Sequence, residues 1–128
     1  MNPLVKEWSR KAEADLQTAK RESRVRKRPN FDAVCFHSQQ AVEKVFKAKL
    51  ASLSRDIPRT HDLTQLLDEL LDAEPPWDAL RPAPDELVAY AVEFRYPGEA
   101  ASQGMAKRAL RNAVEICKEV HRSLSSMS

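Results

Sequence analysis

The chain has 128 residues, of which 31% are charged and only two are glycine, and its formal net charge is +2. This length suits one domain that buries a core without disulfides or a metal, and so few glycines weigh against sheets joined by tight turns and against most phosphate-cradling loops. We therefore expect a single all-α domain over residues 1–128.

The first half of the chain predicts two long helices joined by a basic connection. Asn2 can cap a helix that begins near Pro3 and runs into the low twenties, with apolar residues at spacings of three and four. Pro29 interrupts this pattern because the residue before a proline avoids helical backbone. Asn30 is then a suitable cap for a second helix over roughly residues 31–53, which carries a wide apolar stripe.

The second half predicts three further helices. Thr60 or Asp62 can cap a helix with an apolar face of leucines, and a proline-rich segment follows it. A fourth helix begins at Pro84 and ends before Pro97, and a fifth covers roughly residues 101–125. The predicted fold is an up-and-down antiparallel helical bundle of four long helices plus a shorter inserted helix.

The cysteine positions and the lack of targeting and metal-binding patterns favour an intracellular domain without a metal. Cys35 and Cys117 each fall within an apolar helical pattern, so we expect buried thiols and neither a disulfide nor a zinc site. We find no secretory leader and no apolar run near the roughly 20 residues of a membrane span, which favours a cytoplasmic protein without membrane contact. The Glu-x-x-His pairs of bundle metal sites are missing, so we predict no metal and no cofactor.

Positive charge is concentrated between the first two predicted helices. Only Glu22 opposes six basic side chains in this short segment, which are Lys20, Arg21, Arg24, Arg26, Lys27 and Arg28. Two interpretations stay open: a solvated connection that like charges keep extended, or an electrostatic footprint for phosphate groups. No aromatic residue interleaves the run, which weighs against base stacking there.

Four short motifs follow one another in a specific order. They are Trp8 with "ADLQTA", "QQAVEK" at residues 39–44, "THDL" at 60–63 and "RYP" at 95–97. With these motifs the sequence resembles the HEPN family, the higher eukaryotes and prokaryotes nucleotide-binding domain, over nearly the whole chain. The resemblance implies a helical bundle that commonly dimerises and places the arginine motifs of both protomers around one cleft. It implies two kinds of function, because many members are metal-independent ribonucleases or toxins, often paired with a minimal nucleotidyltransferase, whereas others only bind nucleotides or partners.

The resemblance places Arg95 where ribonuclease members carry an arginine that is followed, after four to six residues, by a histidine. Such a histidine can move the proton of a ribose 2'-hydroxyl while the arginine stabilises charge on the phosphate. In this chain the three positions for that histidine are Ala100, Ala101 and Ser102, and none of them can accept a proton at neutral pH. The missing histidine weighs against the catalytic activity of the ribonuclease members.

Two other histidines could replace the missing one. His37 lies on the second predicted helix. His61 follows Arg55 at the spacing of the motif, but it does so in a different connection, where it more simply organises the entry to the third helix. The candidate catalytic residues are therefore Arg95 with His37 or His61.

A polar row follows the second predicted helix, because His37, Gln40, Lys44 and Lys47 recur at intervals of three or four and so project from one side. This row could line a cleft that faces a phosphate or a base. In the alternative, Gln40 bonds across a helix interface, His37 is a satisfied boundary residue, and the two lysines are solvated while Lys47 pairs with Glu43. Both alternatives stay open.

The predicted function is a homodimeric interaction module that binds nucleotide or RNA phosphate and partners a minimal nucleotidyltransferase in a toxin–antitoxin system. Its predicted ligand-binding residues are Gln40, Lys44, Arg95 and Tyr96; the last two stand at a helix end before a proline, where side chains project from irregular backbone. The alternative is a metal-independent toxin ribonuclease that cleaves RNA by 2'-hydroxyl attack.

Overall fold

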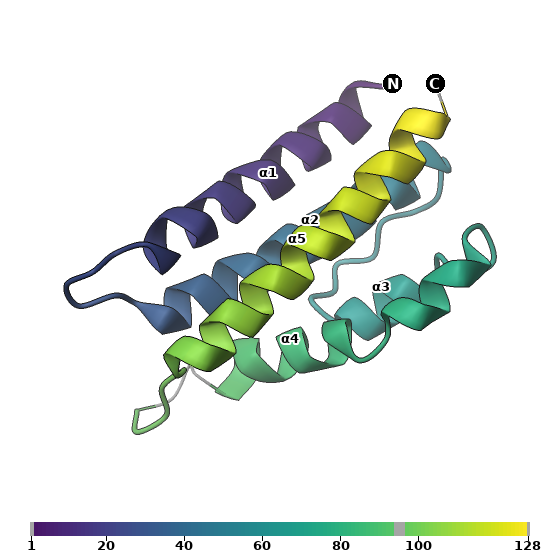
Figure 1. Cartoon of the computed structure of the whole chain (residues 1–128). Helices are drawn as coiled ribbons and strands as arrows, with labels where there is room; N and C mark the ends of the chain where they lie inside the picture. Colours follow the sequence, from purple (N-terminus) through teal and green to yellow (C-terminus); the bar gives the residue numbers. More distant parts are fainter. Residues whose placement is uncertain (1, 94–96, 128) are drawn as a thin grey trace.

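A computed structural model describes residues 2–93 and 97–127 and consists of helices and their connections over these ranges (Figure 1). The helices, in chain order, are α1 (Pro3–Ser23), α2 (Phe31–Ser52), α3 (Leu63–Asp68), the 3₁₀ helix η1 (Pro75–Leu80), α4 (Ala83–Glu93) and α5 (Gln103–Ser126). The all-α class predicted from the sequence is confirmed.

Side-chain caps fix where the helices begin. Asn2 and Asn30 each accept a backbone N–H bond at 2.9 Å, from the first turns of α1 and α2 respectively. Asp62 accepts one at 3.0 Å at the start of α3, and the Ser102 hydroxyl accepts one at 3.1 Å at the start of α5. These bonds satisfy backbone donors that have no partner within the helix, so the predicted caps at Asn2, Asn30 and Asp62 are confirmed.

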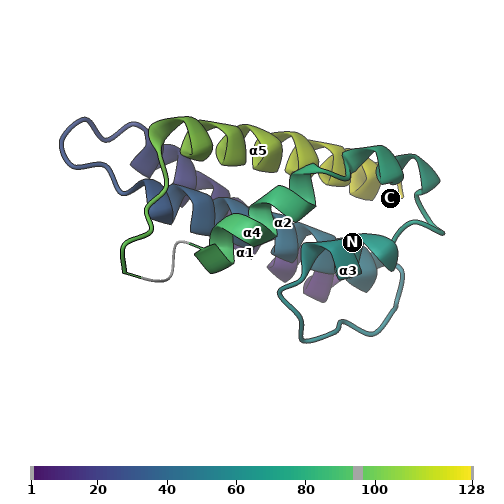
Figure 2. The ribbon, with the colours of Figure 1, turned by 90° about the horizontal axis from the view of Figure 1, so that it is seen from below.

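Helix α2 lies at the centre of the bundle and contacts α1, α3, α4 and α5 (Figures 1 and 2). Helices α1, α2 and α5 are the long ones, with 21, 22 and 24 residues, whereas α4 has 11 and α3 only six. The apolar pattern of leucines continues beyond the end of α3, but the N–H of Leu70 turns back to the carbonyl of Leu67 at 2.9 Å. Leu70 is therefore a buried core residue that lies in a turn and not in a helix.

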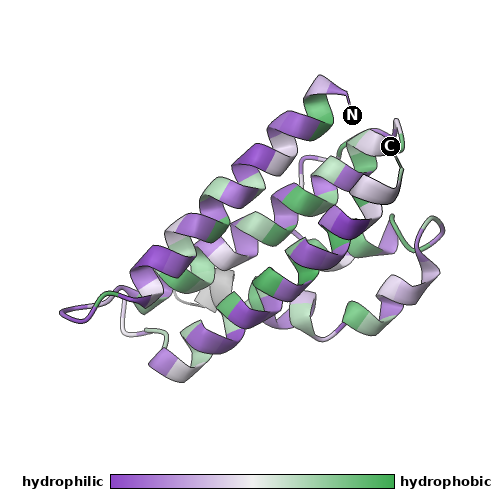
Figure 3. Ribbon diagram, turned by 45° about the horizontal axis from the view of Figure 1, so that its top comes forward, coloured by the Kyte–Doolittle hydropathy of each residue, from purple (hydrophilic) through white to green (hydrophobic). Residues whose placement is uncertain are grey.

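The apolar faces of the helices meet in one core, and polar residues lie mainly on the outer faces (Figure 3). Trp77 of η1 is 2% exposed and stacks on Phe46 of α2, with ring centroids 6.4 Å apart. Its indole N–H donates to the Glu119 carboxylate on α5 at 2.9 Å. The proline-rich segment is thus fixed onto the bundle.

The two cysteines are core residues, also as predicted. Both are buried, Cys35 on α2 and Cys117 on α5. Burial raises the pKa of the Cys35 thiol to about 11 and that of Cys117 to about 12. Neither thiol is ionised at neutral pH, so neither is a nucleophile.

Acid should weaken the attachment of η1. Hydrogen bonds from Arg122 and Trp77 lower the pKa of the Glu119 carboxyl from 4.5 to about 2. A depressed folded-state pKa contributes stability that is present above the ordinary value and is lost as pH falls through about 2. In urea unfolding between about pH 5 and 2, the parent should therefore lose more stability than Glu119→Gln. Parallel losses in both proteins would contradict this contribution.

Candidate functional site

The polar row on α2 is anchored by a carboxylate of α1. The imidazole Nδ1 of His37 lies 2.8 Å from one carboxylate oxygen of Asp15, and the Lys44 ammonium bonds the other oxygen. Asp15 is only 12% exposed, whereas His37 and Lys44 are 30% and 24% exposed. One carboxylate thus holds both residues at the half-buried seam between α1 and α2.

The Asp15 carboxylate determines what the two α2 residues can do. A carboxylate only accepts hydrogen bonds, so Nδ1 of His37 carries the proton and, in the neutral ring, Nε2 carries the lone pair. This arrangement orients His37 as a proton acceptor. The charge of Lys44 is in turn largely neutralised, which lowers its value as an isolated phosphate-binding cation.

The Gln40 amide of the row and the amide of its neighbour Gln39 bond within the protein. The Gln40 amide donates to the side-chain oxygen of its neighbour Gln39 at 2.7 Å, and the Gln39 amide donates to the His61 carbonyl at 3.1 Å. Gln40 is half-buried. This chain of bonds joins α2 to the connection before α3, where sequence reasoning expected His61 to act.

A buried ion pair lies one turn further along α2. Glu43 and Lys47 are 5% and 7% exposed, and the Lys47 ammonium donates to the carboxylate at 3.1 Å. The same carboxylate accepts from Nδ1 of His61 at 2.8 Å, and the ammonium lies 5.5 Å from the ring centroid of Trp8. The predicted Glu43–Lys47 pair is confirmed. The alternative in which Lys47 is solvated is wrong, because α1 covers it.

Arg55 and His61 belong to separate interactions. The Arg55 guanidinium donates to both carboxylate oxygens of Asp72, at 2.8 and 2.6 Å, and to the Glu69 carbonyl at 2.6 Å. These hydrogen bonds raise the pKa of Arg55 and lower the pKa of Asp72. His61 is 79% exposed and faces Glu43. Arg55 and His61 have the spacing of the ribonuclease motif, but each bonds a different carboxylate of the protein.

The basic connection, residues 24–30, carries cations without counterions. Its four basic side chains, Arg24, Arg26, Lys27 and Arg28, are exposed. None of them bonds or pairs with another side chain in the described part of the chain. The opposing carboxylate of Glu22 accepts the Asn30 backbone N–H at 2.7 Å. Unpaired cations on one turn produce a local positive field that no surface ion pair cancels.

Residues 97–102, which precede α5, lie at the same end of the bundle as the basic connection (Figures 1 and 2). The Ala101 N–H donates to the Asp32 carboxylate on the first turn of α2 at 2.7 Å, which ties the two regions together. Lys107, on the second turn of α5, is exposed and forms no ion pair with another described residue. Exposed cations therefore occur both in the basic connection and near the start of α5, and both segments lie at this end of the bundle.

The comparisons with known proteins agree with this architecture. The HEPN domain model matches residues 5–123. The chain belongs to the HEPN family. Its fold is similar to that of TT1696 from Thermus thermophilus, a crystal structure with 25% sequence identity and a TM-score of 0.78, over 92% of this chain and 96% of that one. No curated protein matches the chain.

The arginine motif by which the sequence resembles ribonuclease HEPN members falls partly outside the described residues. Arg95 and Tyr96 lie in the gap between residues 93 and 97, so their predicted ligand-binding and catalytic roles stay predictions. The structure places Ala101 and Ser102, where the histidine would stand, just before α5. Ala101 is buried and Ser102 caps α5, so both residues have structural roles.

The described parts of this HEPN domain contain neither a group of possible metal ligands nor a membrane-spanning helix. Over residues 2–93 and 97–127, no three His, Cys, Asp or Glu side chains are grouped so that they could hold a metal ion. Nor does any described helix combine the length and apolarity needed to cross a membrane.

The sequence analysis did not identify the structural roles of two charged residues of this HEPN domain, Asp15 and Lys49. Asp15 falls three residues after Ala12 and four before Ala19, on the buried face of α1, and an acidic residue in that register was a usable signal. Lys49 is also buried, and its ammonium donates to the Ser123 hydroxyl at 2.8 Å. Its counterion is the Glu74 carboxylate, 3.6 Å away. Nothing in the sequence marked Lys49, because both partners lie far from it along the chain.

Proposed function

We propose that this HEPN-domain protein is a binding module for the phosphates of RNA or nucleotides, with the basic connection as its main contact. The observation that carries the proposal is the set of four exposed cations at residues 24–28, none of which has a partner among the described residues. This set lies at the same end of the bundle as the start of α5 (Figure 1). Phosphate contacts of this kind supply affinity without sequence preference. Arg95 and Tyr96 would add contacts to the same ligand, whereas Gln40 and Lys44, which already bond Gln39 and Asp15, would contribute less.

RNA with several phosphates fits this surface better than a single nucleotide. Four exposed cations follow one another within residues 24–28, which is more positive charge than one phosphate group can pair with. The basic connection itself contains no Phe, Tyr or Trp on which a base could stack. We therefore expect binding that depends on the backbone of the RNA and only weakly on its bases.

The salt dependence of binding tests this proposal. A labelled single-stranded RNA should bind the parent protein in fluorescence anisotropy, and the logarithm of its association constant should fall with the logarithm of salt concentration with a slope near −0.7 per phosphate contact, or about −3 for four contacts. Binding with no salt dependence, or no binding at low salt, would refute the proposal.

The assembly that we propose is a homodimer that pairs with a minimal nucleotidyltransferase in a toxin–antitoxin system. Its support is the family membership, because such pairing is expected for many HEPN proteins. In a dimer the basic connections of two protomers would double the charge available to one RNA, which would steepen the salt dependence.

A second candidate function is metal-independent cleavage of RNA, and the pairing of Asp15 with His37 favours it. The carboxylate orients the imidazole with its Nε2 lone pair available, and His37 stands seven residues after Asn30, or about 10 Å along the helix from the basic connection. His37 would accept the proton of a 2'-hydroxyl while a guanidinium such as Arg95 stabilises the phosphate.

Replacing His37 and His61 by alanine, singly and together, separates the two functions. If the parent cleaves RNA in the presence of EDTA, His37→Ala should abolish cleavage while His61→Ala retains it. Cleavage that survives in the double variant would exclude a histidine base. A parent that binds RNA without cleaving it would be the binding module alone.

A further inference from the structure

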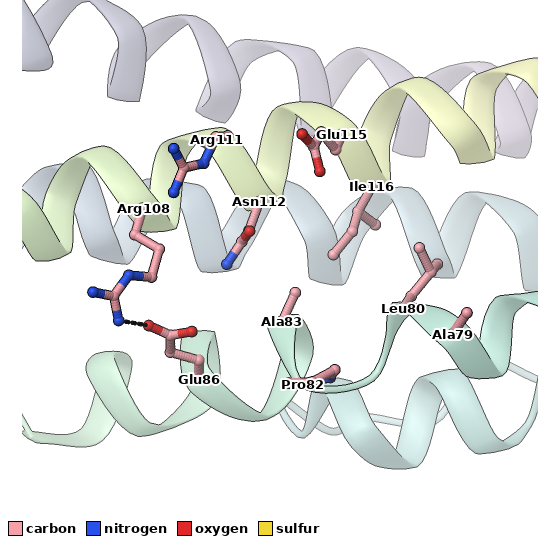
Figure 4. A pocket seen from close by; sticks show the side chains of 10 residues that line it. All are labelled: Ala79, Leu80, Pro82, Ala83, Glu86, Arg108, Arg111, Asn112, Glu115 and Ile116. Atoms are coloured by element: carbon pink, nitrogen blue, oxygen red, sulfur yellow. Dashed lines mark hydrogen bonds and ion pairs between the residues drawn. The ribbon is translucent and has the colours of Figure 1, made fainter.

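A pocket of about 360 Å³ lies between the start of α4 and the middle of α5 (Figure 4). It shares no residue with the basic connection or with the polar row of α2. Its apolar wall comes from Leu80, Pro82 and Ala83 on one side and Ile116 of α5 on the other. This volume is at the lower end of the range for small-molecule sites.

The polar side chains of the pocket divide into one ion pair and three groups that have no protein partner among the described residues. The Arg108 guanidinium donates to the Glu86 carboxylate at 2.9 Å. Arg111 and Glu115 stand one turn apart on α5, yet neither pairs with the other or with another described residue. Between them, Asn112 points towards α4, and its amide has no hydrogen-bond partner among the described residues (Figure 4).

The charges of the lining select a class of ligand. Two arginines and two glutamates sum to zero, so a phosphate dianion gains little net attraction there. A ligand that carries both a carboxylate and an ammonium group would satisfy Arg111 and Glu115 together. The apolar wall adds a requirement for an apolar side chain next to those two groups.

We propose that this pocket binds a free α-amino acid with an apolar side chain. Its carboxylate would bond the Arg111 guanidinium, its ammonium would bond the Glu115 carboxylate, and the Asn112 amide would bond either group between them. Side chains at positions i and i+4 of a helix begin about 5–6 Å apart, so both can reach substituents of a single α-carbon. The side chain of the ligand would pack on Ile116 and Leu80.

Leucine and its blocked derivatives test the proposed ligand class. In titrations followed by NMR of the ¹⁵N-labelled protein, L-leucine should saturate the amide shifts of residues 79–86 and 108–116 with a dissociation constant of about 1 mM or tighter. L-leucinamide and N-acetyl-L-leucine should each bind at least about tenfold more weakly, because each lacks one charge. Equal binding of N-acetyl-L-leucinamide would favour a peptide segment, and preferential binding of AMP a nucleotide; either would overturn the proposal, as would no saturation by leucine.

Single substitutions test the proposed contacts. Arg111→Gln and Glu115→Gln should each weaken leucine binding at least about tenfold, while Lys118→Gln, an exposed cation on the same helix outside the pocket, should leave it unchanged. Because Arg111 and Glu115 are exposed and have no partner among the described residues, their variants should melt at the parent temperature. Retained affinity in both variants, or an equal loss in Lys118→Gln, would contradict the assignment.

Discussion

Replacing Glu43 by alanine should destabilise the fold by about 3–5 kcal/mol, because it leaves the buried Lys47 ammonium without its counterion. The Lys47 side chain is 7% exposed, and its ammonium bonds the Glu43 carboxylate at 3.1 Å. The ammonium also faces the Trp8 ring, which carries no charge. His61, the second partner of the carboxylate, is 79% exposed and can return to water. The loss therefore arises mainly from Lys47.

Urea unfolding of two further variants isolates this effect. Glu13→Ala removes an exposed carboxylate of α1 and should change the free energy of unfolding by no more than about 0.5 kcal/mol. The double variant Glu43→Leu with Lys47→Leu removes both charges and should recover most of the stability, since apolar residues often replace a buried ion pair without cost. A double variant as unstable as Glu43→Ala would show that the cost lies in lost packing or in the His61 contact.

Neutralising the basic connection should produce the largest functional loss. We expect the variant with Arg24, Arg26, Lys27 and Arg28 all replaced by glutamine to bind single-stranded RNA about two to three orders of magnitude more weakly at 0.1 M salt, because each lost phosphate contact removes about 0.7 from the salt slope. These side chains are exposed and have no partners in the described part of the chain, so the fold should be unaffected.

A variant with the same change in net charge is the matched control. Lys6, Arg10, Lys11 and Lys118 are exposed cations of α1 and α5, and replacing these four by glutamine lowers the total charge equally. This control should retain the salt slope of the parent. If both variants lose affinity to the same extent, the binding follows overall charge and not the basic connection.

The fold was largely predictable because its signals are local. Asn2, Asn30 and Asp62 are helix caps recognisable from residue type and position, and apolar spacing located the long helices. The length of α3 was less predictable, because Leu70 continues the apolar pattern of the helix although it lies in a turn. Local spacing shows which side chains are buried, but not whether helical hydrogen bonding continues.

The candidate site was less predictable because its contacts join different helices. The row from His37 to Lys44 follows from spacing within α2, but its anchor Asp15 comes from α1, 29 residues before Lys44. Which α1 residue meets which α2 residue depends on how the two helices cross. The burial of Lys47 has the same origin. The spacing of residues within one helix does not show which residue of another helix it faces.

Mapping RNA onto the ¹⁵N-labelled protein by NMR tests the central claim most directly. A short single-stranded RNA should shift the amides of residues 24–30 and 97–107, while those near Leu4 and Met127, at the opposite end of the bundle, should not move (Figure 1). Shifts confined to that opposite end, or to the α4–α5 pocket, would contradict the account.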